Sequence, residues 1–147
     1  MFRSFMQDAL DQAREAAEAG EVPVGAVISR RGQIVARARN RMVELGDPTA
    51  HAEMLAIRTA CDELGSPRLT GCALWVTLEP CAMCAGAIAA ARIDRLHFAA
   101  SDPKSGGVVH GARVLSQPQA HHICEIHEGA RADDASALLR AFFAARR

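Results

Sequence analysis

The apolar run CALWVTLE at 72–79, stopped by Pro80, constrains the fold of this chain more than any other feature. Such a continuous run is typical of a strand that is buried on both faces. Proline has no amide hydrogen for strand pairing and is favoured in the first turn of a helix. The chain therefore predicts a helix at 81–92 (CAMCAGAIAAAR) and a second strand at 95–101 (RLHFAAS). Strand, helix and strand at this spacing predict a right-handed crossover between parallel strands.

Hydrophobic periodicity predicts the remaining elements. Apolar residues that recur at three- and four-residue steps predict three further helices, at 2–19, 50–65 and 132–147. The segment VGAVISRRGQIVARARN at 24–40 predicts a β-hairpin that turns at Arg31 and Gly32. HICEI at 122–126 predicts a last short strand. Residues 101–121 are rich in Gly, Pro, Ser and His, and we expect a loop there with one short helical turn.

The composition is that of an ordinary globular domain. The chain has 147 residues, of which 50% are hydrophobic and 23% are charged. We therefore predict one α/β domain over 1–147, with a mixed sheet and helices on both faces. No apolar run reaches the ~20 residues that span a bilayer. The N-terminal segment is acidic and amphipathic, unlike a secretory signal, so we expect a cytoplasmic protein that does not bind membranes.

The overall net charge and the number of cysteines do not identify a binding partner. The 17 basic and 17 acidic residues cancel, which weakens any argument from net charge to nucleic acid. However, 16 of the basic residues are Arg, and five of these fall within 30–41 without an acid among them. The five cysteines form an odd set with no secreted framework, so we expect thiols or metal ligands.

Two short motifs place metal-binding side chains at the starts of predicted helices. In PCAMC, Cys81 and Cys84 are three residues apart, so on a helix they share one face and can bind one ion. The positive end of the helix lowers the pKa of such thiols. In HAE, His51 adds a nitrogen, and three protein ligands leave one position of a tetrahedral zinc ion open for water. Glu53 is then placed to carry protons rather than to coordinate.

Each motif alone is a weak signal. A lone C-x-x-C is also typical of a redox pair, and a lone H-x-E carries almost no information. Together, and in this order, H-x-E and P-C-x-x-C are the signature of zinc nucleobase deaminases, in which the Glu is the general acid and base. The pair of motifs therefore predicts a zinc-dependent hydrolase.

Four longer segments extend this similarity: EVPVGAV, DPTAHAE, TLEPCAMCAGAI and SDPKSGG. In this order and at about this spacing they resemble bacterial tRNA-specific adenosine deaminases, from about residue 20 to the C-terminus. The resemblance implies a three-layer α/β/α cytidine deaminase-like fold with a mixed sheet of about five strands. It also implies a homodimer with one Zn²⁺ per subunit, bound by His51, Cys81 and Cys84.

The activity implied by the resemblance is deamination of adenosine to inosine at the wobble position of an arginine tRNA. In that reaction a zinc-activated water attacks C6 of adenine, and Glu53 shuttles the proton. The same resemblance implies substrate contacts from a further set of residues: Asn40, Ala52, Pro80, Asp102, Lys104, Phe142, Phe143, Arg146 and Arg147.

These contacts have expected roles and ordinary alternatives. The Asn40 amide would bond the flipped nucleotide, and the main-chain amides of Ala52 and Cys81 would orient the base or the attacking oxygen. Asp102 and Lys104 would contact sugar and phosphate of the anticodon loop. The terminal Phe and Arg residues would stack on bases and neutralise phosphates. By itself, however, Asn40 also fits a turn asparagine, and Asp102 with Lys104 fits a solvated charge pair. The two Phe residues fit a core stripe equally well.

Two other functions compete with this prediction. A deaminase of free guanine, cytosine or nucleosides shares the same zinc motifs. A non-catalytic zinc-binding or RNA-binding module has no use for a glutamate beside an open coordination position. The segment 107–119 departs most from the family pattern, which leaves the detailed contacts with the anticodon loop open.

Overall fold

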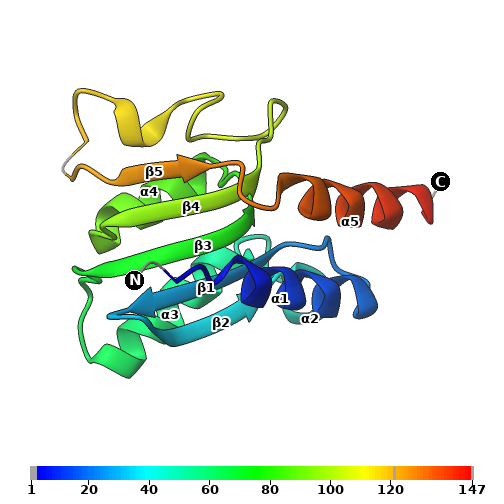
Figure 1. Cartoon of the computed structure of the whole chain (residues 1–147), viewed down its shortest axis with the longest axis horizontal. Coiled ribbons are helices and arrows are strands. Elements are labelled where there is room, and N and C mark those ends of the chain that lie inside the picture. Colours follow the sequence, from blue (N-terminus) through cyan, green and yellow to red (C-terminus); the bar gives the residue numbers. More distant parts are fainter. Residues whose placement is uncertain (1–2, 121, 147) are drawn as a thin grey trace.

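The computed structural model describes residues 3–120 and 122–146. At its centre is a five-stranded sheet in the order β2-β1-β3-β4-β5 (Figure 1). The strands are β1 (Gly25–Arg30), β2 (Gln33–Arg39), β3 (Cys72–Leu78), β4 (Arg95–Ala100) and β5 (Glu125–Glu128). β2 and β3 pair antiparallel with β1, whereas β4 pairs parallel with β3 and with β5. The sheet is therefore mixed, and β3 and β4 are parallel neighbours, as predicted.

Helices cover both faces of this sheet (Figure 1). They are α1 (Met6–Glu18), α2 (Met42–Leu45), α3 (Ala52–Leu64), α4 (Ala82–Ala91), α5 (Ala132–Ala144) and a short 3₁₀ turn, η1 (Val114–Ser116). α1 and α5 lie on one face, and α3 and α4 lie on the other. This arrangement confirms the predicted three-layer α/β/α fold.

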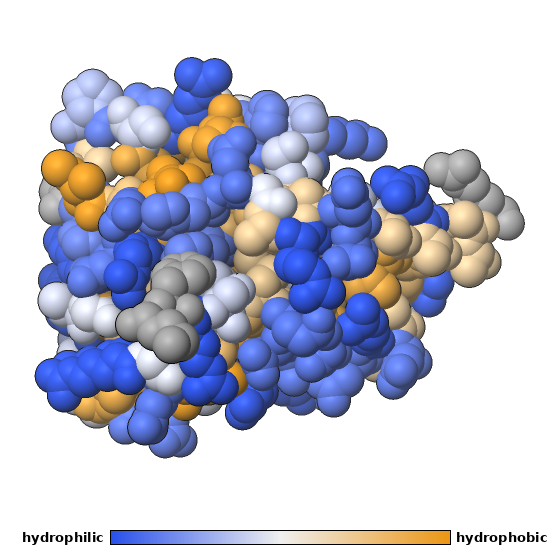
Figure 2. All heavy atoms as spheres, in the orientation of Figure 1, coloured by the Kyte–Doolittle hydropathy of each residue, from blue (hydrophilic) through white to orange (hydrophobic). Residues whose placement is uncertain are grey.

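The two faces of the sheet bury different clusters because side chains alternate along a strand. Val27 and Trp75 face α1 and pack with its buried residues. Ile28 and Leu74, their neighbours in sequence, face α3 and α4. The outward side of α1 is hydrophilic in Figure 2, as expected for a helix that buries one stripe against a sheet.

The largest differences from the predicted boundaries occur in the first helix, the last helix and the last strand. The first helix begins at Met6, because the backbone of Phe5 (φ −110°, ψ 17°) is not helical. The Phe5 side chain is nevertheless buried. Residues 1 and 2 of the predicted helix lie outside the described residues. The last helix ends at Ala144. The last strand is Glu125–Glu128 rather than 122–126. This strand lies at the edge of the sheet and is mostly exposed, so its charged and polar residues give no hydrophobic signal for a strand. Ile123, an apolar residue of the predicted strand, is 91% exposed and lies outside the observed one.

Local turns position the site. The hairpin turns at Arg31 and Gly32, both at positive φ, as predicted for a two-residue hairpin. The parallel strands β3 and β4 end side by side, where the Glu79 amide donates to the Ala100 carbonyl at 2.8 Å. α4 follows β3 directly at this edge of the sheet, so its N-terminus and the loop after β4 lie together.

No helix in the described part of the chain is long and apolar enough to cross a bilayer.

Candidate metal centre and active site

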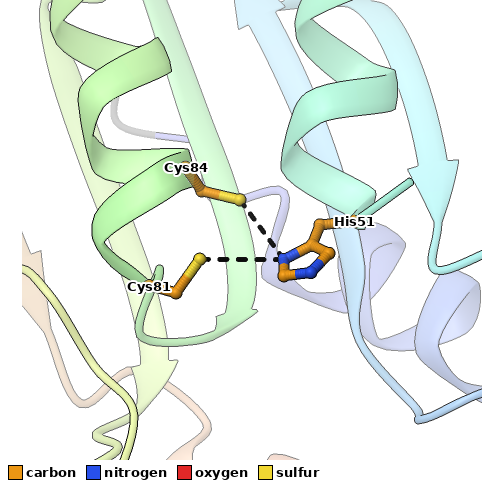
Figure 3. A group of neighbouring side chains, drawn as sticks. All are labelled: His51, Cys81 and Cys84. Carbon is orange, nitrogen blue, oxygen red and sulfur yellow. Dashed lines mark hydrogen bonds between the residues drawn. The ribbon is translucent and has the colours of Figure 1, made fainter. Parts of the chain in front are cut away.

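His51, Cys81 and Cys84 come together where the N-termini of α3 and α4 meet (Figure 3). His51 is the N-cap of α3, Cys81 is the N-cap of α4, and Cys84 lies in the first turn of α4. His51 Nδ1 lies 3.8 Å from the Cys81 Sγ and 3.5 Å from the Cys84 Sγ. The three ligand atoms all lie within 4.8 Å of one another, and no other such group of three occurs in residues 3–120 and 122–146.

These distances fit a tetrahedral metal ion. Bonds of about 2.3 Å to sulfur and about 2.0–2.1 Å to nitrogen put neighbouring ligand atoms roughly 3.5–3.8 Å apart. Two thiols and one imidazole are also the donor set that zinc prefers. The group therefore fits a zinc ion with three protein ligands, and the prediction that both helix starts contribute agrees with this geometry.

The electrostatics of the group already favour a thiolate. Hydrogen bonds from Cys84 and from His51 lower the pKa of Cys81 to about 3. The hydrogen bond to Cys81 and the fields of Cys81 and Glu53 raise the pKa of His51, although burial opposes this. Sharing its proton with Cys81 raises the pKa of Cys84. A bound cation would replace that shared proton and stabilise both thiolates.

Glu53 lies in the first turn of α3 and is 4% exposed. Its Oε1 atom has no hydrogen-bond partner among the described residues. Burial raises the pKa of this carboxyl, which brings it closer to the range in which a group exchanges protons near neutral pH. A carboxyl with a free oxygen at the wall of a pocket is suited to general acid and base chemistry.

The pocket beside Glu53 has a volume of about 210 Å³. Its lining combines two of the three candidate ligands, His51 and Cys81, with apolar and polar side chains: Val22, Val24, Asn40, Met42, Glu53, Leu78, Glu79, Asp102 and Ser105. Asn40 and Asp102, two of the predicted substrate contacts, thus share a pocket with the predicted proton carrier. An apolar pocket with a few convergent polar groups is the usual form of a small-ligand site.

Two predicted contacts have partners inside the protein. The Ala52 amide donates to Asn40 Oδ1 at 2.8 Å, and Ala52 is fully buried. This amide therefore positions Asn40, and the predicted contact between the Ala52 amide and substrate is not supported. The Asn40 Nδ2 donates to the Val22 carbonyl at 3.2 Å, which fixes its second end. Asn40 keeps one amide hydrogen and one acceptor lone pair for a ligand.

Other predicted contacts separate into buried and exposed groups. Pro80 is buried, does not line the pocket, and accepts the Gly107 amide at 2.8 Å through its carbonyl. Phe142 is 8% exposed and lies under the guanidinium of Arg146, 3.5 Å from the ring centroid. The structure therefore places Pro80 and Phe142 in packing roles, and a stacking role for Phe142 is not supported. Arg147 lies outside the described residues.

Asp102, Lys104 and Phe143 line a second hollow of about 430 Å³. This hollow shares Val22, Leu78, Asp102 and Ser105 with the pocket beside Glu53, so the two are adjacent. Asp102 Oδ1 accepts the amides of Lys104 and Ser105 at 3.2 and 3.0 Å, which shapes the loop. Phe143 is 47% exposed and is available to a ligand there.

Glu79 is an important residue of this region that sequence reasoning missed. Its side chain is fully buried, and its Oε2 accepts the amides of Val108, Val109 and His110 at 3.0–3.1 Å. Its Oε1 accepts the Asp102 amide at 3.0 Å and contacts His110 Nδ1 at 2.8 Å. Burial alone would raise the pKa of Glu79, but these hydrogen bonds outweigh it and lower the pKa to about 2.

Two glycines allow the loop to pack this closely. A Cβ on Gly106 would lie 2.4 Å from Glu79 Oε2, and one on Gly107 would lie 2.5 Å from the amide nitrogen of Ala82. The loop after β4 is therefore closely packed around the Glu79 carboxylate and the start of α4. The only sequence signal for this was a charged residue at the end of a buried strand, directly before Pro80.

Replacing Glu79 with glutamine is expected to lower the free energy of unfolding by about 1.5–3 kcal/mol, because amide groups lose charged acceptors in a buried place. Chemical denaturation measures this change, and hydrogen exchange at residues 102 and 108–110 is expected to accelerate. The exposed Glu18→Gln is the matched control. Equal stability and equal exchange in the two variants would show that the loop does not depend on the Glu79 charge.

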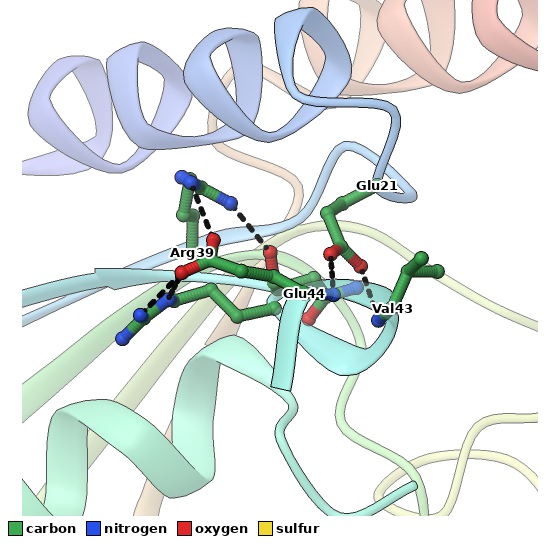
Figure 4. Close-up of polar contacts among 6 residues, drawn as sticks. Glu21, Arg39, Val43 and Glu44 are labelled. Atoms are coloured by element: carbon green, nitrogen blue, oxygen red, sulfur yellow. Dashed lines mark hydrogen bonds and ion pairs between the residues drawn. The ribbon is translucent and has the colours of Figure 1, made fainter. Parts of the chain in front are cut away.

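Helix α2 forms one rim of the pocket and was not predicted. It has only four residues and no buried ones, so hydrophobic periodicity gives no signal for it. The buried carboxylate of Glu21 accepts the amides of Val43 and Glu44 at 3.1 and 2.8 Å (Figure 4). A long-range contact therefore holds this turn and places Met42 in the pocket wall.

The sequence of this chain is similar to those of known deaminases, which agrees with the observed fold and with a candidate metal site at His51, Cys81 and Cys84. The family model of the MafB19-like deaminases matches residues 2–147. A tRNA-specific adenosine deaminase of Agrobacterium fabrum is 50% identical over 143 residues, which are 97% of this chain and 94% of the relative.

The structure of this chain is also similar to solved structures of deaminases. A structure from work on A-to-I editing by tRNA deaminases at the wobble position of transfer RNA has a TM-score of 0.90 and 50% identity, and the match covers 92% of this chain and 98% of that one. A guanine deaminase from Nitrosomonas europaea has a TM-score of 0.83 at 28% identity, with 95% and 82% covered. The chain therefore belongs to the MafB19-like deaminase family and is similar over nearly its whole length to tRNA-specific adenosine deaminases.

Proposed function

We propose that this protein is a zinc-dependent tRNA adenosine deaminase that converts adenosine to inosine at the wobble position of an arginine tRNA anticodon. The observation that carries the proposal is the group of His51, Cys81 and Cys84, because two of its members, His51 and Cys81, line the same pocket as the buried Glu53 carboxyl. The relative that is 50% identical is named a tRNA-specific adenosine deaminase, which supports an adenosine of a tRNA as the substrate. We propose that residues 1–147 act as one domain, in a cytoplasmic homodimer.

The proposed metal ligands are His51, Cys81 and Cys84, with one zinc ion per chain. Zinc in a site with three protein ligands supplies activation of water as a nucleophile near neutral pH. Glu53 has one carboxylate oxygen without a protein partner and a raised pKa, so it is suited to accept a proton from the attacking water. It would then deliver that proton to ring nitrogen N1, and afterwards pass the proton of the new C6 hydroxyl to the leaving amino group. C6 gains an oxygen and loses ammonia, which balances the hydrolysis.

Asn40 is proposed to bond the flipped nucleotide with the amide hydrogen and lone pair that its protein contacts leave available. Asp102, Lys104 and Phe143 are proposed to contact the neighbouring nucleotides, and Arg146 and Arg147 to contact phosphates. The second hollow supports an RNA substrate, because a free base would occupy only the first pocket. A polynucleotide would extend from one pocket into the other.

The competing function is deamination of a free purine, which the likeness to a guanine deaminase favours. Incubation of the zinc-loaded protein with an arginine tRNA that carries a wobble adenosine is expected to yield inosine at that position. Nucleoside mass spectrometry measures it. Parallel incubations with guanine, cytosine and free adenosine are expected to yield no product. Turnover of guanine together with unchanged tRNA would contradict the proposed substrate and favour the purine deaminase.

A further inference from the structure

A further cavity, separate from the pocket beside Glu53 and from the adjacent hollow, is lined by four arginines. It has a volume of about 370 Å³ and lies across the edge strand β2. Arg37 and Arg39 come from β2, Arg41 from the start of α2, and Arg58 from α3. We call this cavity the arginine groove.

The groove holds an excess of positive charge. Glu44 is the one acidic residue in its lining, against four guanidinium groups. Arg39 Nη2 lies 3.1 Å from Glu44 Oε1 (Figure 4). Arg41 Nε lies 3.0 Å from Glu44 Oε2. The chain as a whole has a net charge of zero, so this excess is a local concentration and not a reflection of overall charge. Clustered guanidinium groups are the usual protein partners of phosphates.

The groove is continuous with the rim of the active-site pocket. Asn40 and Met42 line the pocket, and their chain neighbours Arg39 and Arg41 line the groove. Arg39 Nη1 also donates to the Asn40 carbonyl at 3.0 Å. The Ala52 amide of α3 donates to the Asn40 side chain, so Asn40 links the pocket to α3, which also supplies Arg58 to the groove. A chain that places one nucleotide in the pocket can therefore reach the groove.

We propose that the arginine groove binds backbone phosphates of the RNA whose target nucleotide lies in the pocket. This inference rests on the proposed function, because it assigns a path to that RNA substrate. The alternative is that the arginines only protect an exposed edge strand from pairing with another strand, a common use of charge at sheet edges. The two differ in one measurable property, because phosphate contacts make RNA affinity depend on salt.

The test uses Arg37→Gln/Arg58→Gln, since both side chains are exposed and neither is bonded to Glu44 or Asn40 in the groove. The matched control is Arg31→Gln/Arg95→Gln, which removes the same charge. Arg31 lies in the β1–β2 turn, and Arg95 opens β4. Strand register places both residues at the end of the sheet away from Glu79 and the pocket.

Binding of an anticodon stem-loop RNA is measured by fluorescence anisotropy between about 50 and about 300 mM salt, in a Glu53→Gln background that slows turnover. The groove variant is expected to bind about tenfold more weakly at low salt, with the slope of log Kd against log salt reduced by roughly 1 to 2. The control variant is expected to keep the slope of the parent protein. An unchanged slope in the groove variant, or an equal loss in both variants, would overturn the proposal.

Turnover separates this proposal from the proposed function. With Glu53 intact, the groove variant is expected to raise the KM for tRNA about tenfold and to leave kcat unchanged. Absence of inosine with the parent protein would contradict the proposed function itself. Inosine formation with equal KM values for parent and groove variant would contradict the groove alone. Circular dichroism and thermal unfolding of both double variants check that each is folded.

Discussion

Replacing Glu53 with glutamine is expected to reduce inosine formation by roughly 10²–10⁴-fold while zinc stays bound. Glutamine has nearly the same shape but cannot accept a proton from water and return it to the leaving group. Glu53 is buried, has an unpartnered oxygen, and is not among the three proposed ligands, so its loss should not remove the metal. The expected pattern is a lower kcat with an unchanged KM, because the interaction acts in the transition state.

Steady-state kinetics on tRNA and metal analysis by plasma mass spectrometry measure the two quantities together. Glu63→Gln is a matched control, because Glu63 is an exposed glutamate near the far end of the same helix. It is expected to keep both activity and zinc. Retained activity in Glu53→Gln would remove the assigned proton transfer, and loss of zinc would mean that Glu53 supports coordination.

Replacing Cys84 with alanine is expected to abolish both zinc binding and turnover. Cys84 is fully buried in the first turn of α4, and an alanine leaves two ligands, fewer than any ordinary zinc site in proteins has. Zinc added to the metal-free parent is expected to stabilise it by about 2.7 kcal/mol when free zinc is 100 times its Kd. The same addition should leave the Tm of Cys84→Ala unchanged.

Differential scanning calorimetry with and without zinc measures this stabilisation, and it is independent of activity. Cys61→Ala is the matched control, since Cys61 is a thiol on α3 that does not line the pocket. It should respond to zinc as the parent does. Equal stabilisation of Cys84→Ala and the parent would refute the assignment of this ligand group.

The ligand group was predictable because its parts are local. Cys81 and Cys84 are one helical turn apart, and Pro80 fixes where the helix can start, so both thiols lie on one face in any fold that forms this helix. The buried strand β3 was predictable for a similar reason, since a short continuous apolar run that ends at a proline is typical of a strand buried on both faces. That His51 lies beside these thiols was predicted from the joint occurrence of the H-x-E and P-C-x-x-C motifs, and hydrophobic periodicity gave no indication of it.

The remaining parts of the site depend on contacts between distant residues. Glu79 accepts amides from residues 23 to 31 positions further along the chain, and nothing near Glu79 in sequence marks those donors. Glu21 holds α2 across a separation of 22 or 23 residues. The Ala52 amide was expected at the substrate but bonds Asn40 instead.

The amino-acid sequence by itself determined the elements whose signals are periodic or local: the strands with buried faces, the helices with apolar stripes, and the spacing of the ligands. Only the tertiary structure decided which buried carboxylates organise the loops, which predicted contacts are enclosed by packing, and where arginines from three elements gather. The physical reason is that a hydrogen bond or a charge cluster depends on distances in space. Those distances are set only when the sheet brings separate segments of the chain together.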